Sequence, residues 1–171
     1  MIESAETINI LGLDPGSRHL GFGVLTLNRL TNQYSYLASG CLHLKDSGLG
    51  IKLTKIYEAI KELAIKYRPS EVAVETVFVK LNPASAIKLG QARGAAIAAA
   101  VSQGASLAEY SPRAVKQALV GYGSAEKIQV QQMVKLLLKQ PKLSQLDETD
   151  ALAIAICHAH SRTKMALTNR L

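Results

Sequence analysis

The sequence lacks tryptophan altogether and contains only two cysteines and two phenylalanines in 171 residues. Cys41 and Cys157 lack the paired spacing of a disulfide framework or a thiolate zinc site, so we expect two reduced thiols. The longest apolar run, residues 95–101, falls far short of the roughly 20 residues that a membrane-spanning helix needs. No cationic segment precedes an apolar run in residues 1–7, which argues against a secretory signal. These absences predict a cytoplasmic protein with no membrane insertion.

Acidic residues are scarce as well: 13 aspartates and glutamates stand against 20 lysines and arginines, for a net charge of +7 and a pI near 9.5. This excess of positive charge favours an acidic partner, nucleic acid before an anionic membrane surface. A generically basic protein remains an alternative at this point. With 48% hydrophobic residues the chain can bury a substantial core, and we expect one globular domain over residues 1–171.

Hydrophobic periodicity and turn residues predict the order of the elements. Strands are expected at residues 8–13, 21–27, 34–40, 72–79 and 107–110, and helices at 51–67, 83–102, 112–121, 124–139 and 148–162. Ser124 is the expected N-cap of its helix, and residues 163–171 are expected to form a loose tail. Three strands in a meander followed by alternating helices and strands predict an α/β fold, a mixed sheet (antiparallel, then parallel) with helices on both faces. Ribonuclease H-like folds use this order of elements.

Four acidic residues stand within apolar runs or at their ends. Asp14 ends the first strand, Glu75 interrupts the strand at 72–79, and Asp147 and Asp150 precede the apolar run of the last helix. Taken singly, a turn residue, a buried salt bridge and helix capping would explain them. Taken together, they favour convergence of two strand ends and one helix start, because a buried carboxylate is costly unless it is paired or binds a metal.

Carboxylates with no cysteine or histidine at ligand spacing favour a hard divalent cation, Mg²⁺ or Mn²⁺, over zinc. Two such ions can activate water and stabilise the leaving oxygen in phosphodiester cleavage, which suits a basic protein that binds nucleic acid. His158 and His160 are two residues apart and do not share a helical face. We therefore attribute them to the negative end of the last helix rather than to a metal site.

Several stretches, in order, cover nearly the whole chain and match a known family. They are residues 10–18 (ILGLDPGSR), 37–41 (LASGC), 75–78 (ETVF), 85–94 (SAIKLGQARG), 115–117 (VKQ), 121–127 (GYGSAEK) and 147–156 (DETDALAIAI). Through these motifs the sequence closely resembles the RuvC family of bacterial Holliday-junction resolvases. The resemblance implies a homodimer that binds a four-way DNA junction and nicks two symmetric strands, using Mg²⁺ (with Mn²⁺ as a substitute), two ions per subunit. It also implies a role in DNA recombination and repair beside a branch-migration helicase complex of RuvA and RuvB.

The resemblance also implies roles for the four acidic residues. Carried over by position, Asp14, Glu75, Asp147 and Asp150 occupy the family's four acidic positions, where they would bind metal and act in catalysis. Some relatives have histidine at the position of Asp147, which makes this residue the most replaceable of the four. Amide substitutions at the other three positions are expected to abolish cleavage.

Three further residues match functional positions of the family. Lys116 and Lys127 correspond to basic residues near the cut phosphate, with a solvated helix lysine as the alternative for Lys127. Phe78 corresponds to an aromatic residue that unstacks bases at the junction centre and binds DNA, with a core position as its alternative.

A stripe of small residues on the helix at 83–102 is a candidate contact surface. Gly90, Gly94 and Ala98 are spaced four apart, which permits close approach of a second backbone. The approaching element would be either a second subunit or the protein's own sheet.

Two other functions compete with the nuclease. Residues 14–21 also resemble the first phosphate loop of actin-like ATPases. Such proteins need two subdomains around the nucleotide, for which 171 residues are too few, and no Walker A motif is present. A catalytically inactive DNA-binding module of the same fold is the other alternative, against which the presence of all four acids argues.

Overall fold

The computed structural model describes residues 6–16, 18–44, 48–76 and 83–168, with side chains up to residue 162. In these residues the chain forms five strands and five helices. The strands are β1 (Thr7–Pro15), β2 (His19–Asn28), β3 (Tyr34–His43), β4 (Glu71–Glu75) and β5 (Ser106–Tyr110). The helices are α1 (Leu49–Tyr67), α2 (Pro83–Val101), α3 (Pro112–Val120), α4 (Lys127–Leu138) and α5 (Leu146–Thr168).

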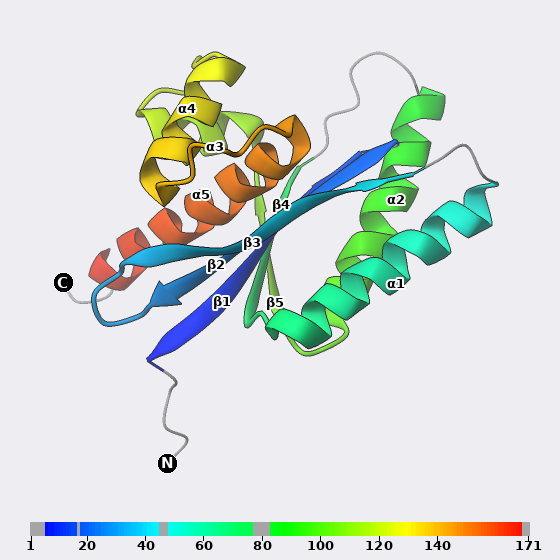
Figure 1. Cartoon of the computed structure of the whole chain (residues 1–171), viewed down its shortest axis with the longest axis horizontal. Coiled ribbons are helices and arrows are strands. Elements are labelled where there is room, and N and C mark those ends of the chain that lie inside the picture. Colours follow the sequence, from blue (N-terminus) through cyan, green and yellow to red (C-terminus); the bar gives the residue numbers. More distant parts are fainter. Residues whose placement is uncertain (1–5, 17, 45–47, 77–82, 169–171) are drawn as a thin grey trace.

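The strands form one mixed sheet in the order β3-β2-β1-β4-β5. β1, β2 and β3 are antiparallel neighbours, whereas β4 is parallel to both β1 and β5. Figure 1 shows α1 and α2 on one face of the sheet and α3, α4 and α5 on the other. The predicted architecture, an antiparallel meander extended by parallel strands between two helical layers, is confirmed.

Alternation along β1 separates two hydrophobic cores. Ile8 and Ile10 belong to the core beneath α3, α4 and α5, and Leu11 and Leu13 belong to the core beneath α1 and α2. Successive side chains of a strand point to opposite faces, so one apolar strand contributes to both cores. β1 is therefore the central strand, buried on both sides.

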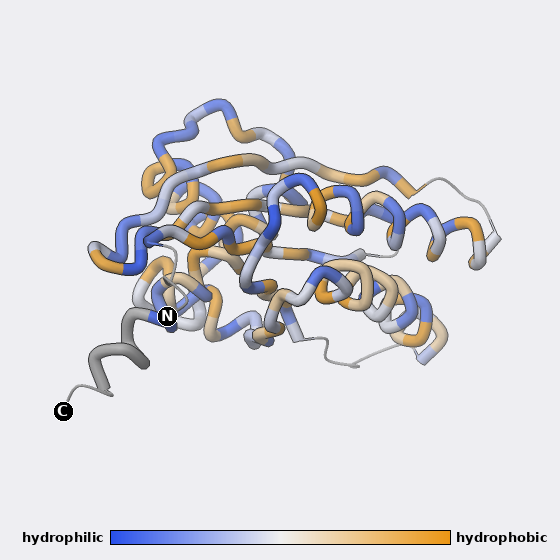
Figure 2. Tube along the Cα trace, turned by 90° about the horizontal axis from the view of Figure 1, so that it is seen from below, coloured by the Kyte–Doolittle hydropathy of each residue, from blue (hydrophilic) through white to orange (hydrophobic). Residues whose placement is uncertain are grey.

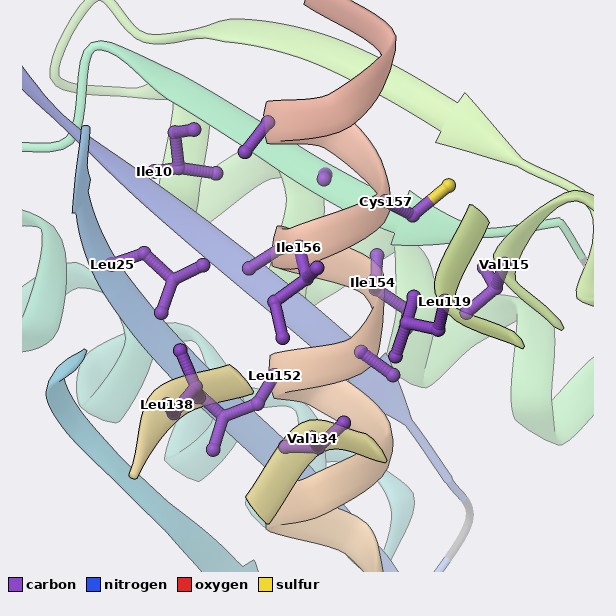
Figure 3. Close-up of a cluster of buried hydrophobic side chains, with 14 of the residues drawn as sticks. Ile10, Leu25, Val115, Leu119, Val134, Leu138, Leu152, Ile154, Ile156 and Cys157 are labelled. Carbon is purple, nitrogen blue, oxygen red and sulfur yellow. The ribbon is translucent and has the colours of Figure 1, made fainter. Parts of the chain in front are cut away.

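The two helical layers are patterned differently. α1 is amphipathic: Ile56, Ile60 and Ala64 are buried four residues apart, and the helical turns in Figure 2 alternate between hydrophobic and hydrophilic residues. In α5, by contrast, all of residues 151–157 are buried, because the helix contacts β1 and β2 on one side and α3 and α4 on the other. Figure 3 shows Ile156 and Leu152 of this helix among side chains from the sheet and the outer helices.

Glycines in the sheet let α5 lie directly against it. A Cβ atom added to Gly12 of β1 would overlap the carbonyl oxygen of Ala151, and one added to Gly21 of β2 would overlap the carbonyl oxygen of Asp147. Any side chain at these positions would lift the start of α5 off the sheet. The close approach places the first turn of α5 beside the end of β1.

Several predicted boundaries differ from the structure. The N-cap of α4 is Glu126 and not Ser124, because the Glu126 side chain accepts from the backbone of Gln129 while the Gln129 side chain binds the Glu126 backbone, forming a capping box. α5 continues to Thr168, so the loose tail expected from residue 163 is wrong up to that point; no proline or glycine follows residue 162 to end the helix. β4 ends at Glu75, and residues 77–79 of the expected strand lie outside the described residues.

Among the residues that the structure describes, no helix combines the length and apolar character needed to span a bilayer.

Candidate active site

The carboxylates predicted from the sequence gather at one edge of the sheet. Asp14 and Glu75 directly follow Leu13 and Val74, which are partners in the parallel ladder of β1 and β4. Asp147 and Asp150 lie in the first turn and a half of α5, which begins at this end of the sheet (Figure 1). Glu75 is the last residue of its strand and not an interruption within it. Convergence of two strand ends with a helix start, as the sequence predicted, is what the backbone shows.

Three of these acids share a pocket with two lysines. A pocket of about 220 Å³ is lined by Asp14, Glu75 and Asp150 together with Lys116 of α3 and Lys127 of α4. Lys127 is the first residue of its helix, and its Nζ lies 2.5 Å from Oδ2 of Asp150. Both predicted lysines are therefore brought to the carboxylates.

Burial and crowding make the negative charges of this pocket costly. Burial raises the pKa of Asp14 from 3.8 to about 7, with the charges of Asp150, Glu75 and Asp147 adding to the effect. Burial and the charge of Asp150 also raise the pKa of Glu75. Such a cluster is stabilised by positive charge placed among its members.

The contact between Lys127 and Asp150 already places one positive charge among these acids. Burial raises the pKa of Asp150, and the hydrogen bond and charge of Lys127 oppose this only in part. Burial alone would lower the pKa of Lys127. The hydrogen bond and charge of Asp150, and to a smaller extent the charges of Asp14 and Asp147, outweigh burial and raise this pKa. The ammonium group therefore stays protonated beside the acids.

The donor set fits a hard divalent cation in its chemistry, because the acidic side chains that line the pocket supply carboxylate oxygens. Within the described part of the chain, no three histidine, cysteine, aspartate or glutamate side chains already surround a common point as a metal site would require. Ligation would therefore require these carboxylates to turn toward one another, with Asp150 moving off Lys127.

Asp147 occupies the other side of the cluster. Its Oδ2 lies 3.7 Å from Nδ1 of His19 and accepts a hydrogen bond of 3.6 Å from Sγ of Cys41. Burial and then the charge of Asp147 raise the pKa of the Cys41 thiol to about 11, so the thiol remains protonated and can donate. The sequence assigned no role to His19 or Cys41, although Cys41 ends one of the stretches that resemble the family, residues 37–41. Both lie near Gly21, the close-approach position: His19 on the same strand, and Cys41 as the partner of Gly21 in β3.

Arg93 of α2 is a further residue that sequence reasoning missed. Its Nε donates to the carbonyl oxygen of Glu75 at 3.2 Å, and its guanidinium group forms an ion pair with Glu109 of β5. The arginine thus holds the backbone of β4 at the residue that carries a pocket carboxylate. An arginine in a helix otherwise rich in alanine and glycine was the available signal.

The two late histidines are structural, for a reason other than the one predicted. Because α5 continues to Thr168, His158 and His160 lie within the helix and not at its negative end. His158 bonds Tyr110 at 2.7 Å and Glu71 at 2.6 Å, whereas His160 bonds Tyr34 and the carbonyl oxygen of Ala118, both at 3.0 Å. These contacts attach α5 to the sheet and to α3.

Phe78, the predicted base-unstacking residue, lies outside the described residues.

Comparisons with known proteins identify the family of this chain. The family model described as crossover junction endodeoxyribonuclease RuvC matches residues 10–158. The RuvC of Colwellia psychrerythraea is 49% identical over 160 residues, which cover 92% of this chain and 90% of that protein. The RuvC of Pseudoalteromonas translucida is 51% identical over 156 residues, which cover 91% of this chain and 88% of that protein.

Solved structures agree as well. The structure of Thermus thermophilus RuvC matches with a TM-score of 0.83 and 32% sequence identity, over 92% of this chain and 96% of that one. The complex of the same protein with a Holliday junction substrate matches with a TM-score of 0.85 over the same shares. These matches confirm the ribonuclease H-like fold and leave the ATPase interpretation without support. The chain belongs to the RuvC family of crossover junction endodeoxyribonucleases.

Proposed function

We propose that this protein resolves four-way DNA junctions by paired, symmetric, metal-dependent nicks in recombination and repair. The observation that carries the proposal is the pocket in which Asp14, Glu75 and Asp150 meet Lys116 and Lys127. The structure of the Thermus relative with a Holliday junction substrate supports the choice of DNA. The basic charge of the chain, +7, suits the same substrate.

The carboxylates are proposed to hold Mg²⁺, with Mn²⁺ as a substitute. Asp14, Glu75 and Asp150 would be the main ligands, with Asp147 as the fourth, around two ions per subunit. When bound, these ions would neutralise the crowded acids and supply an activated water and a stabilised leaving oxygen. The raised pKa values of Asp14, Glu75 and Asp150 support this assignment, because they report carboxylates that need added positive charge.

The lysines are proposed to hold the phosphate that is cut. Lys127 is the first residue of α4, at the positive end of the helix dipole, which favours an anion. A lysine is unfavourable for the helix at that position, so its retention there fits a phosphate-binding role. Once metal replaced it on Asp150, its ammonium group would be available to a phosphate oxygen. Lys116, on the pocket wall, would add a second cation.

The small-residue stripe of α2 supports a homodimer. Gly90, Gly94 and Ala98 are exposed, and a Cβ atom added to either glycine would meet no atom within 4 Å. The chain's own core is contacted instead by the buried residues Ala92 and Ala96. Of the two alternatives left by the sequence, packing against a second subunit is therefore favoured, and a two-fold dimer suits paired nicks in a two-fold substrate.

The base-unstacking role of Phe78 and the contact with the RuvA and RuvB helicase complex rest on the family resemblance, and we propose them on that basis. We also propose the cytoplasmic location, which rests on the sequence features given above.

The proposed function is tested by incubating end-labelled four-way junction and matching linear duplex with the protein, with and without Mg²⁺. We expect symmetric paired nicks in the junction only, and only with metal. Asp150→Asn should abolish the nicks, whereas Glu148→Gln should retain them, because Glu148 bonds Ser39 and the Gln145 backbone and does not line the pocket. Equal cutting of linear duplex, or nicks by Asp150→Asn at the wild-type rate, would contradict the proposal.

A further inference from the structure

A second and larger pocket opens at the same edge of the sheet, on its other face. It measures about 700 Å³ and lies between the first halves of α1 and α2. Its cationic lining residues are Arg18, Lys52 and Lys88, and none of the described residues that line it is acidic. A cavity whose described lining has three cations and no carboxylate favours an anionic ligand.

The backbone adds to this positive character. Both α1 and α2 begin at the pocket, so the positive ends of two helix dipoles point toward it. Neither helix has an acidic residue in its first turn, and among the described residues no side-chain cap hydrogen bond is present at the N-cap of α1, Gly48. The start of α5, in contrast, carries Asp147 and Glu148. The charge of the two N-termini at the pocket is therefore not neutralised by acids of their own first turns.

Exposed apolar side chains line the pocket together with its cations. Leu49 is 49% exposed and Ile87 is 62% exposed, and both line the pocket. Large exposed aliphatic side chains beside cations suit a ligand with alternating anionic and apolar parts, as in the phosphates and deoxyribose rings of a DNA strand. A single inorganic anion would leave most of this volume and both side chains uncovered.

The position of the pocket relates it to the carboxylates. Arg18 follows Asp14 by four residues, so their Cα atoms are at most about 14 Å apart. The backbone N–H of Gly16, between them, donates to the carbonyl oxygen of His19. The backbone of Arg18 is fixed by a 2.8 Å hydrogen bond from the N–H of Leu44, at the end of β3. A DNA backbone that passes the acidic pocket could thus continue over the edge of the sheet into the basic one.

We propose that this pocket binds the phosphate backbone of a junction arm a short distance from the strand that is cut. The site rests on the proposed function for its substrate, and it lies apart from the carboxylates and lysines of the acidic pocket. Its task is to anchor the arm, through Arg18 and Lys88 in particular, while the acidic pocket takes the scissile phosphate.

The test measures junction affinity of the full chain without divalent metal, at several salt concentrations, for Arg18→Ala, Lys88→Ala and the double variant. Each single substitution should weaken binding by about three- to tenfold and reduce the slope of log K against log salt by about 0.9. Lys55→Ala is the matched control, because Lys55 is exposed on α1 but does not line the pocket. If Arg18→Ala and Lys88→Ala keep the affinity and slope of the control, the pocket does not bind DNA and the proposal is overturned.

A second measurement locates the contact on the DNA. Junctions in which single phosphates are replaced by neutral methylphosphonates should show one position in each of two symmetric arms that weakens wild-type binding but not binding by the double variant. If every position affects the two proteins equally, the proposal fails. Wild-type cleavage with Mg²⁺ is scored separately: absence of nicks would contradict the proposed function, whereas unchanged binding by the pocket variants would contradict only the arm site.

Discussion

Replacing Asp14 by asparagine should abolish cleavage and, without metal, make the protein more stable at alkaline pH. The folded protein raises the pKa of Asp14 from 3.8 to about 7. A carboxyl group whose pKa is raised by folding binds its proton more tightly in the folded state, so it lowers stability as pH rises from about 4 to 7. The difference of about 3.2 units between the two pKa values corresponds to about 4 kcal/mol in the free energy of unfolding. Above pH 7 the folded protein is destabilised by this full amount.

The effect of a single substitution should be smaller than that total. The charges of Asp150, Glu75 and Asp147 contribute to the raised pKa of Asp14, so the acids of the cluster titrate together. When one carboxylate is neutralised, the others ionise more readily, and the gain in stability is smaller than the full amount. We expect Asp14→Asn to add about 2 kcal/mol at pH 8, or roughly 4–8 °C in melting temperature for a chain of this size. pH 5 lies only about 1.2 units above the unfolded pKa of 3.8, so less than half of the destabilisation by Asp14 is present there. The stability gained by Asp14→Asn should therefore fall by more than half.

Thermal unfolding in EDTA at pH 5 and pH 8 measures this difference. Glu148→Gln, outside the acidic pocket, serves as the control and should show no such pH dependence. Adding Mg²⁺ at pH 8 should raise the melting temperature of the wild type more than that of Asp14→Asn, because metal binding relieves the same repulsion. Destabilisation by Asp14→Asn to the same extent at both pH values would refute the reasoning, since Asp14 would then be a structural residue and not a costly buried charge.

Four further substitutions test the rest of the site. Glu75→Gln should abolish cleavage in a single-turnover assay while junction affinity persists, and near wild-type cutting would remove Glu75 from the mechanism. Asp147→Asn should have a milder effect on cleavage, because Asp147 lies outside the shared pocket. Lys127→Ala should lower the single-turnover rate at least about tenfold, or about 1.4 kcal/mol, with little change in affinity, and a wild-type rate would leave Lys127 as a solvated charge. Arg93→Gln should raise the Mn²⁺ concentration needed for half-saturation in calorimetry by releasing the Glu75 backbone, and an unchanged isotherm would assign Arg93 to the Glu109 ion pair alone.

The sequence predicted the elements and the convergence of the acids because both follow from local pattern. Period-two and period-3.6 hydrophobicity determined the order of strands and helices, and the ends of β1 and β4 meet whenever two strands are parallel neighbours. The cap of α4 was missed because Ser124 and Glu126 are both able to cap, and the choice depends on the reciprocal bonds with Gln129. Contacts such as Arg93 with the Glu75 carbonyl join separate elements and leave no periodic signal in the sequence.

The fold itself supplies the energy that keeps the acidic residues together. Repulsion among the carboxylates would push the start of α5 away from β1, yet two sets of contacts between this helix and the sheet oppose that displacement. Near its start, Gly12 and Gly21 allow the helix backbone to lie directly on the sheet. Farther along, His158 bonds Glu71 of β4 and His160 bonds Tyr34 of β3, so the helix is attached to strands on both sides of β1. The acids are thus held at close range by packing and hydrogen bonds outside the pocket, which leaves their unfavourable charge to be relieved by a bound cation.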